Sequence, residues 1–268
     1  MKVGVAIQLN HTREEELLEF QMSLREIGVE PIYYGLIPFS DEITGAEGFA
    51  DYDAVIVYGT VKLIRLWQKG LMPKGTTVFY SEPAFDQFNY SLCLPNRILL
   101  NGEAKFSTLG KIKDKMFDFP VFAKPTRDLK AFAGVIVEPG RTIGEEVYGR
   151  PQDSSLTEDE VVLYGPLKNI VKEYRNFVVD SKIVDSSIYK IGSKVTYEVP
   201  SEDERKMIAE FFEEVICYYE PHDVYVVDFA LLDTGKMVVI EYNCWNCAGM
   251  YSVDRRKVFK AVIDFVSQ

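Results

Sequence analysis

Cysteine and histidine are scarce in this chain: its 268 residues include four cysteines and two histidines. The cysteines are too few and too scattered for the disulfide framework of a small secreted domain, so reduced thiols are expected. Cys244 and Cys247 form a C-x-x-C pair, which could bind zinc or cycle through a disulfide. A four-ligand zinc site would need distant partners, which leaves this pair as a minor alternative.

Long hydrophobic runs are also lacking. The opening run, residues 1–8, is too short for a signal peptide, and no stretch approaches membrane-spanning length, so a cytoplasmic protein is expected. Basic residues are outnumbered, 30 against 41 acidic ones, which gives a net charge of -11. This charge repels polyanions and argues against general nucleic-acid or anionic-membrane binding.

Several nucleotide and hydrolase motifs are missing. The sequence contains no G-x-G-x-x-G and no P-loop, which argues against a dinucleotide oxidoreductase and a P-loop ATPase. A nucleophile elbow is missing too. Any nucleotide chemistry must therefore use a different scaffold.

The residues that are present predict a large core. Hydrophobic residues make up 47% of the chain and aromatic residues 13%, enough for two or three lobes. The first hundred residues alternate short apolar runs with helical patterns, which is typical of βα units and a largely parallel sheet, hence an α/β lobe. Strands are expected at 3–9, 54–58, 76–80 and 98–100, and helices at 14–27 and 63–69.

From residue 111 onward the pattern changes to longer strands with hairpin turns, which indicates antiparallel sheets and an α+β organisation. Strands are expected at 121–124, 135–138, 161–164, 171–179, 182–189, 224–232 and 237–242, with helices at 202–219 and 258–266. Residues 144–160 are rich in acids and read as a solvated loop.

The hairpin at 224–243 places two acids opposite each other. With Thr234-Gly235 as a two-residue turn, Asp228 faces Glu241, with β-carbons about 5 Å apart, and Asn243 shares their face. Two carboxylates and an amide suit magnesium. A bulged turn would shift the register by one residue. The alternative is that the acids lie in solvent at strand ends or pair with lysines.

Two further elements carry charge on apolar strands. Lys124 ends the run at 119–125, where a buried ammonium needs an anionic partner, unless it snorkels to solvent. In the hairpin at 171–190, a turn at Asp180-Ser181 pairs position 175 with 186 and 173 with 188. Glu173, Arg175 and Lys190 then lie on one face, although a surface salt-bridge cluster would look the same.

Together these residues resemble the ATP-grasp superfamily. An Asp in one strand followed by Glu-x-Asn in the next is similar to its metal-binding signature. Glu-Tyr-Arg with a following lysine looks closest to a small clade found largely in phages and bacteria and named for two arginines and a lysine. The resemblance implies a Rossmann-like lobe at 1–97, a small ATP-grasp lobe at 98–165 and a large one at 166–268.

The resemblance also implies roles. Magnesium would be held by Asp228, Glu241 and Asn243, and the two acids would contact ATP through the ion. Lys124 would contact the ATP phosphates and Glu173 the ribose. The backbone of Leu163 and Tyr164 would contact adenine. Arg175 would contact the transferred phosphoryl group, with Lys190 and Arg127 as further catalytic cations.

The implied activity is an ADP-forming carboxylate-amine ligase acting on small-molecule or peptide substrates. A kinase on the same fold and a non-catalytic nucleotide sensor are the alternatives, and the oligomeric state stays open. His11, Asn246, Cys247 and Gly249 are candidate substrate contacts, weighed against ordinary packing. Replacing Asp228 or Glu241 by alanine is expected to abolish turnover while leaving the fold largely intact.

Overall fold

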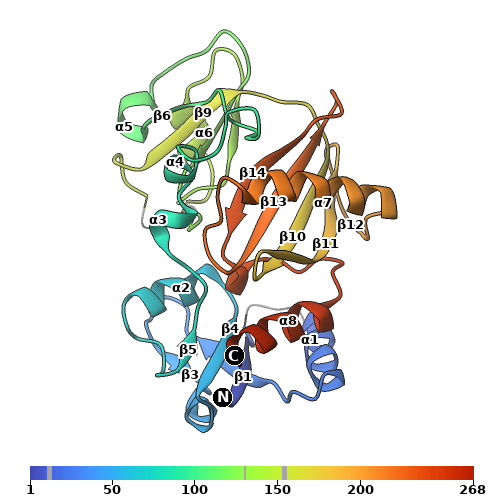
Figure 1. The fold of residues 1–268 in the computed structure, drawn as a ribbon. Helices are drawn as coiled ribbons and strands as arrows, with labels where there is room; N and C mark the ends of the chain where they lie inside the picture. Colours follow the sequence, from blue (N-terminus) through green and yellow to red (C-terminus); the bar gives the residue numbers. More distant parts are fainter. Residues whose placement is uncertain (11–13, 130, 153–155) are drawn as a thin grey trace.

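The computed structural model describes residues 1–10, 14–129, 131–152 and 156–268. Within these residues the chain forms three β-sheets, two of five strands and one of four. The sheets define three lobes, and both ends of the chain lie in the first of them (Figure 1). The predicted mixture of a parallel N-terminal sheet and antiparallel C-terminal sheets is confirmed.

The first lobe is built around the strand order β3-β2-β1-β4-β5, in which β1, β2, β4 and β5 are parallel. Its strands are β1 (Val3–Gln8), β2 (Ile32–Leu36), β3 (Ile43–Thr44), β4 (Ala54–Tyr58) and β5 (Thr76–Thr77). Its helices are α1 (Glu14–Glu26), η1 (Glu47–Asp51) and α2 (Val61–Gln68). Three glutamates in the first turn of α1 complement its macrodipole.

Two expectations for this region need correction. The strand expected at 76–80 covers only β5, and residues 98–100 form no strand. Leu99 instead makes a single parallel bridge to Val239 of the third lobe. The sequence pattern also missed β2, in which two tyrosines and Gly35 interrupt the apolar run.

The second lobe is an antiparallel sheet in the order β6-β9-β7-β8. Two short helices lead into it, α3 (Glu82–Phe85) and α4 (Gln87–Tyr90). Its elements are β6 (Lys105–Thr108), α5 (Leu109–Ile112), β7 (Val121–Pro125), β8 (Val135–Val137), α6 (Ile143–Tyr148) and β9 (Val161–Pro166).

Helix α6 overturns the prediction that residues 144–160 form one solvated loop. The Thr142 hydroxyl accepts a hydrogen bond from the Glu145 N–H, and the Glu145 carboxylate accepts one from the Thr142 N–H. This capping box starts the helix, and Val147 anchors it in the core of the lobe. The residues expected at the centre of the loop, Asp153 to Ser155, lie outside the described part of the chain.

The third lobe is antiparallel throughout, in the order β12-β11-β10-β13-β14. Its strands are β10 (Ile170–Val179), β11 (Lys182–Ile191), β12 (Lys194–Glu198), β13 (Val224–Leu232) and β14 (Met237–Asn243). Helix α7 (Glu202–Ile216) covers one face, and η2 (Trp245–Cys247) and α8 (Arg255–Val266) close the chain.

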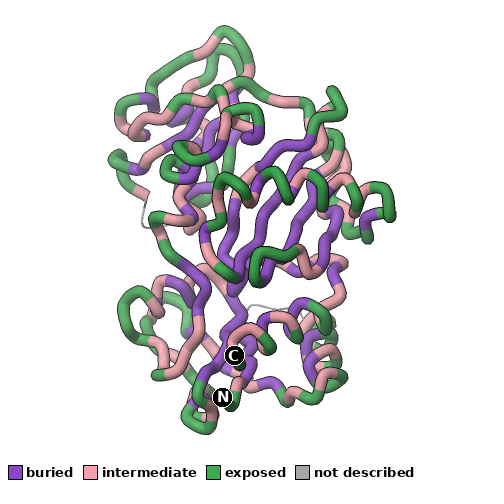
Figure 2. Tube along the Cα trace, in the orientation of Figure 1, coloured by how far each residue is buried: buried purple, intermediate pink, exposed green. Residues whose placement is uncertain are grey.

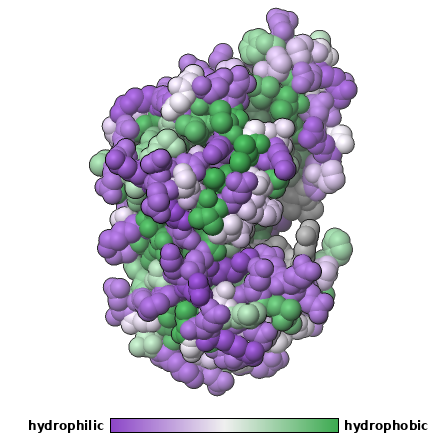
Figure 3. All heavy atoms as spheres, turned by 90° about the vertical axis from the view of Figure 1, so that its right-hand side faces the viewer, coloured by the Kyte–Doolittle hydropathy of each residue, from purple (hydrophilic) through white to green (hydrophobic). Residues whose placement is uncertain are grey.

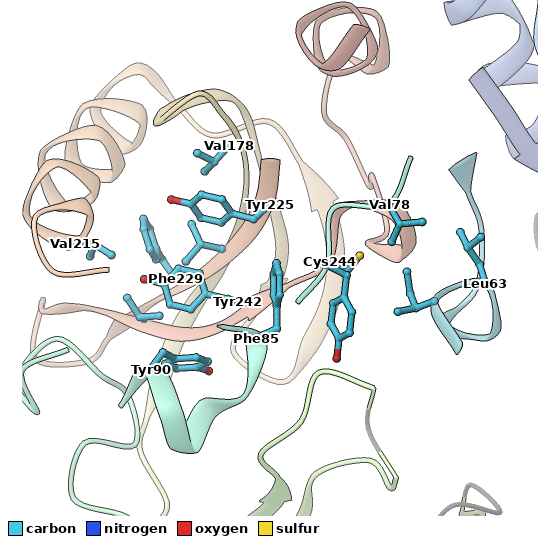
Figure 4. Close-up of a cluster of buried hydrophobic side chains, with 14 of the residues drawn as sticks. Leu63, Val78, Phe85, Tyr90, Val178, Val215, Tyr225, Phe229, Tyr242 and Cys244 are labelled. Atoms are coloured by element: carbon cyan, nitrogen blue, oxygen red, sulfur yellow. The ribbon is translucent and has the colours of Figure 1, made fainter. Parts of the chain in front are cut away.

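One continuous core joins the first lobe to the third. The cluster runs from α2 and β4 to the sheet face under α7, as the side chains between Leu63 and Val215 show in Figure 4. The central strands are buried along their length, while the helices expose one side (Figure 2). Helix α8 packs back against α1 through Phe259 and Phe20, so the C-terminal helix lies on the first lobe.

The outer surface mixes apolar and hydrophilic residues, with several apolar patches on the upper part of the face in Figure 3. Among the described residues, no helix combines the length and apolar character needed to cross a bilayer.

Candidate functional site

The hairpin of β13 and β14 brings Asp228 directly opposite Glu241, as the sequence predicts, but by a different route. The turn is not two residues long. The Leu232 N–H donates to the Lys236 carbonyl at 2.9 Å, which leaves a three-residue loop with Gly235 at φ 80°. This shifts the register by one position. A bulge between Asp228 and Phe229 on one strand, opposite Ile240 on the other, shifts it back.

The two acids are held by cations rather than facing each other alone. Arg175 grips Asp228 through two parallel hydrogen bonds, of 2.9 Å from Nε and 2.7 Å from Nη2. Lys124 donates to Glu241 at 2.7 Å across the gap between the second and third lobes. The Asn243 amide donates to Asp228 at 3.1 Å, so all three predicted oxygen-bearing side chains converge on one sheet face.

The hairpin of β10 and β11 has the predicted turn but not the predicted register. Asp180 and Ser181 both have positive φ, 51° and 56°, as in a tight two-residue hairpin turn. Two bulges then intervene, so Arg175 pairs with Ser187 instead of position 186, and Glu173 pairs with Lys190 instead of position 188. The prediction of these two pairs is therefore wrong.

The bulges have a direct consequence for the charges. They set Lys190 opposite Glu173, and the two side chains form an ion pair of 2.7 Å. Glu173 is 7% exposed and Arg175 8% exposed, so this is no solvated surface cluster. Buried charges of this kind persist only where each is compensated.

A cavity of about 790 Å³ lies between the second and third lobes. Six of the charged residues singled out by the sequence line it: Lys124, Glu173, Arg175, Lys190, Asp228 and Glu241. Its apolar walls include Phe122, Phe132 and Ile240, and the connection at 166–170 between the two sheets forms another side. A deep, half-apolar cleft with a few convergent polar groups is the usual form of a small-molecule site.

Burial and charge act in opposite directions on Arg175. Burial alone lowers the pKa of its guanidinium, but the adjacent Asp228 carboxylate outweighs that effect and holds the pKa well above its ordinary value. Arg175 is therefore a permanent cation in this cavity.

Two predicted contributors lie elsewhere. Leu163 and Tyr164 are in β9, between β6 and β7, so their backbone groups are committed to ladders on both sides. Neither lines the cavity, whereas residues 166–170 do. Arg127 also lines neither large cavity. It pairs with Glu160, whose side chain is 1% exposed, and with Glu82 at 3.6 Å.

A second cavity, of about 950 Å³, lies between the first and third lobes. Arg175 and Tyr251 line both cavities, so they stand at the junction. Asn243, Cys244, Cys247 and Gly249 also line this second cavity, with cations of α2 on the opposite side. The sequence reasoning missed the contribution of α2. The sequence signal for it is Lys62 and Arg65 on one face of α2, followed directly by Lys69, with no acid in the helix.

Tyr251 is a further residue that the sequence did not reveal. Its φ of 44° is in the left-handed region, which is strained for a residue with a Cβ. Its ring lies 4.9 Å from the Arg175 guanidinium and stacks between Tyr189 and Tyr197, with interplanar angles of 23° and 13°. The stack fixes one face of Arg175.

The C-x-x-C segment contributes to the packing between the first and third lobes. Asn246 is wholly buried, and its amide donates to the Val57 carbonyl at 2.7 Å and accepts from the Phe79 N–H at 2.8 Å. Cys244 and Cys247 are free thiols, and burial raises the pKa of Cys244 well above its usual range. Across the described ranges no group of three or more His, Cys, Asp or Glu could hold a metal ion. His11 lies outside those ranges.

Three solved structures define the class of fold. An ATP-grasp RimK domain protein from Sphaerobacter thermophilus is 18% identical, with a TM-score of 0.62, over 96% of this chain and 98% of that one. D-alanyl-alanine synthetase A from Vibrio cholerae is 15% identical, TM-score 0.57, over 100% and 97%. N5-carboxyaminoimidazole synthetase from Staphylococcus aureus is 10% identical, TM-score 0.58, over 97% and 77%. At these identities they show an ATP-grasp fold and no more.

The family is shown by the sequence. The model of the ATP-grasp domain, R2K clade family 2, matches residues 102–261, and the chain belongs to this family. This agrees with the resemblance to a clade named for two arginines and a lysine. No curated protein matches the chain.

Proposed function

We propose that this protein is an ADP-forming ligase that activates a carboxylate with ATP and joins it to an amine. The observation that carries the proposal is the cavity between the second and third lobes, where Lys124 from β7 meets five charged residues of the large sheet. Membership of an ATP-grasp family supports the use of ATP. The solved ligases with this fold support ligation as the reaction class.

We assign the nucleotide to this cavity. Lys124 would contact the phosphates and Glu173 the ribose. The connection at 167–169 would supply the backbone groups for adenine, in place of Leu163 and Tyr164. Residues 167–169 lie outside the ladders that engage β9, and they line the cavity.

Magnesium is the ion that this family of folds implies, and the donors fit it. Asp228 and Glu241 are direct cross-strand neighbours and Asn243 shares their face, so two carboxylates and one amide offer hard oxygen ligands. Once bound, the ion would neutralise charge on the nucleotide phosphates. Arg175 and Lys124 now occupy those carboxylates, so they would turn toward phosphate oxygens when the nucleotide enters.

The second cavity would hold the substrates to be joined. A carboxylate oxygen of the substrate attacks the γ-phosphorus of ATP. The bond between the γ-phosphorus and the β-γ bridging oxygen breaks, and ADP leaves. The amine nitrogen then attacks the acyl carbon, loses a proton and expels inorganic phosphate. Arg175 stands at the junction of the cavities, where it would stabilise charge on the transferred phosphoryl group, and Lys190 is available to the phosphates.

We also propose 1–97, 98–165 and 166–268 as the three domains, with α8 packed onto the first.

The test is ADP release with a panel of carboxylates and amines, with products identified by mass spectrometry. Lys190→Met should lower turnover at least about tenfold, because a charge-assisted contact is lost. Lys182→Met is the matched control, since Lys182 begins the same strand but its side chain is 80% exposed. An amide product with ADP and phosphate supports the ligase. A stable phosphoester indicates a kinase, and nucleotide binding without any product indicates a sensor; either result rejects the proposal.

A further inference from the structure

Three tyrosines form a stack that leads from the two large cavities to the surface of the third lobe. Tyr189 of β11 and Tyr197 of β12 both stack on Tyr251, at centroid distances of 5.4 and 4.9 Å. Tyr189 lines the cavity assigned to the nucleotide, and Tyr251 lines both cavities. Tyr197 lines neither of the two and is 59% exposed. The stack therefore connects a surface residue of an edge strand with the junction of the cavities.

The position of the Tyr251 ring is specified by its neighbours, at a cost in backbone strain. Gly249 makes room for the ring, because a Cβ there would lie 3.1 Å from the nearest ring atom. The following residue, Ser252, is anchored on β11. Its N–H donates to the Ser187 hydroxyl at 3.3 Å, and the two hydroxyl oxygens are 2.7 Å apart. Ser187 is the cross-strand partner of Arg175, so the ring is fixed relative to that arginine.

The Arg175 guanidinium lies over two rings of the stack. Its central carbon is 5.4 Å from the ring centre of Tyr189 and 4.9 Å from that of Tyr251. Its Nε and Nη2 atoms donate to Asp228, whereas its Nη1 contacts with the Gly249 carbonyl and the Tyr251 hydroxyl are long, 3.4 Å each. The aromatic contact is thus separate from the ion pair with the carboxylate.

The proposed reaction requires Arg175 to change partners, from Asp228 in the ligand-free protein to the transferred phosphoryl group. A buried guanidinium between two anionic partners is costly unless another group continues to hold it. A cation–π contact depends on where the cation lies over the ring and needs no particular hydrogen-bond acceptor. Such a contact can therefore persist while the hydrogen bonds are exchanged.

We infer that the stack of Tyr189, Tyr251 and Tyr197 holds Arg175 in place while it passes from Asp228 to the transferred phosphoryl group. Tyr197 is then a positioning residue, which touches neither cavity and acts through Tyr251. This inference rests on the proposed function and names further residues on which the same site depends. Truncation of Tyr197 removes one stacking partner of Tyr251, so it should weaken the contact with the γ-phosphoryl group and spare the rest of the nucleotide.

The experiment measures two affinities by calorimetry with magnesium present, for ADP and for the β,γ-imido analogue of ATP. Both nucleotides contain the base, the ribose and the α- and β-phosphates, so the ratio of the affinities reports the contact with the γ-phosphoryl group. Wild type should bind the analogue about tenfold or more tighter than ADP. Tyr197→Leu should lower this ratio about threefold, with little change for ADP. Tyr197→Phe keeps the ring and should keep the ratio. Val195→Ala is the matched control, since it truncates a 62% exposed apolar side chain of the same strand, and should also keep the ratio.

A double variant tests whether Tyr197 acts through Tyr251. Tyr251→Leu should lower the ratio more than Tyr197→Leu does. The variant with both changes should match Tyr251→Leu, because the outer ring cannot influence Arg175 once the middle ring is gone. The melting temperature of Tyr197→Leu should stay close to that of wild type, because the side chain is mostly in solvent.

A wild-type ratio near one, a Tyr197→Leu ratio equal to that of wild type, or an equal loss for both nucleotides overturns the inference. Independent, additive effects of the two substitutions on the free energy difference overturn it as well. The proposed function is measured separately, by ADP release. A protein that forms ADP and an amide although its ratio ignores Tyr197 retains the proposed function and rejects the positioning role. A protein whose ratio follows the stack but that never forms ADP supports the positioning role and rejects the ligase.

Discussion

The ion pair between Arg175 and Asp228 allows a quantitative test, because it is buried and its geometry is bidentate. Asp228 is 1% exposed and Arg175 8%. At an effective dielectric constant of about 20, two unit charges about 4 Å apart attract by about 4 kcal/mol. The change Asp228→Asn preserves shape and removes this attraction, and it leaves a buried guanidinium beside a neutral amide.

We therefore expect Asp228→Asn to lower the free energy of unfolding by about 3–5 kcal/mol without ligand, the usual cost of leaving one partner of a buried pair. A chain of 268 residues has an unfolding entropy of about 0.56 kcal/mol/K, so the melting temperature should fall by about 5–9 °C. This revises the sequence-based expectation that losing Asp228 affects turnover but leaves the fold largely intact.

The assay is thermal and urea unfolding of ligand-free protein, with ADP release measured in parallel. Asp264→Asn is the control for the same chemical change, since its pair with Lys260 is 57% and 63% exposed, and it should cost less than about 0.5 kcal/mol. The double change Arg175→Met with Asp228→Leu should recover most of the loss, because it removes both buried charges. A melting temperature for Asp228→Asn equal to that of wild type, or a double variant no better than the single one, would refute the reasoning.

Three other changes probe the frame around the site. Burial would raise the pKa of Glu204, but hydrogen bonds from Lys172, from the Ser201 backbone and from Tyr174 lower it to about 2. Its stabilisation is present above pH 4.5 and is lost as pH falls toward 2, so Glu204→Gln should cost about 1–2 kcal/mol at pH 7 in urea unfolding, and much less at pH 2.5. Tyr251→Leu should lower kcat/KM about 3- to 30-fold by removing the ring over Arg175, whereas Tyr251→Phe should stay near wild type. Asn246→Ala should cost about 2–4 kcal/mol in thermal unfolding, because it strands buried backbone groups.

The residues of the candidate site were predictable where strand periodicity alone decides the face. Side chains alternate along any strand, so Glu173 and Arg175 share a face whatever their partners are. The pairing of β10 with β11 was not predictable, because two bulges with no sequence signature moved Glu173 from position 188 to Lys190. In the hairpin of β13 and β14 the three-residue turn and the bulge beside Asp228 shift the register in opposite directions. The predicted pairing of Asp228 with Glu241 is therefore confirmed, although the predicted two-residue turn is wrong.

Residues whose position depends on how lobes pack were beyond sequence reasoning. Arg127 follows the same strand as Lys124, yet it pairs with Glu160, the residue before β9, and does not line the cavity. Leu163 and Tyr164 do not line the cavity, and their strand β9 is central in its sheet rather than at an edge. Lys62 lines the cavity between the first and third lobes because α2 shares a hydrophobic core with the segment that follows β14, a contact that no local pattern encodes.

The three ion pairs of the proposed nucleotide cavity together predict how binding depends on the metal. Lys124, Arg175 and Lys190 each form an ion pair with one carboxylate, so these three charges are compensated without ligand. Metal-free ATP would draw the cations to its phosphates and leave Glu241 facing negative charge, a cost that a divalent ion removes. Glu241→Gln should therefore bind metal-free ATP more tightly than wild type and MgATP more weakly. Calorimetry with EDTA or with magnesium measures both, and a variant that weakens or strengthens the two forms alike would show that Glu241 does not act through the ion.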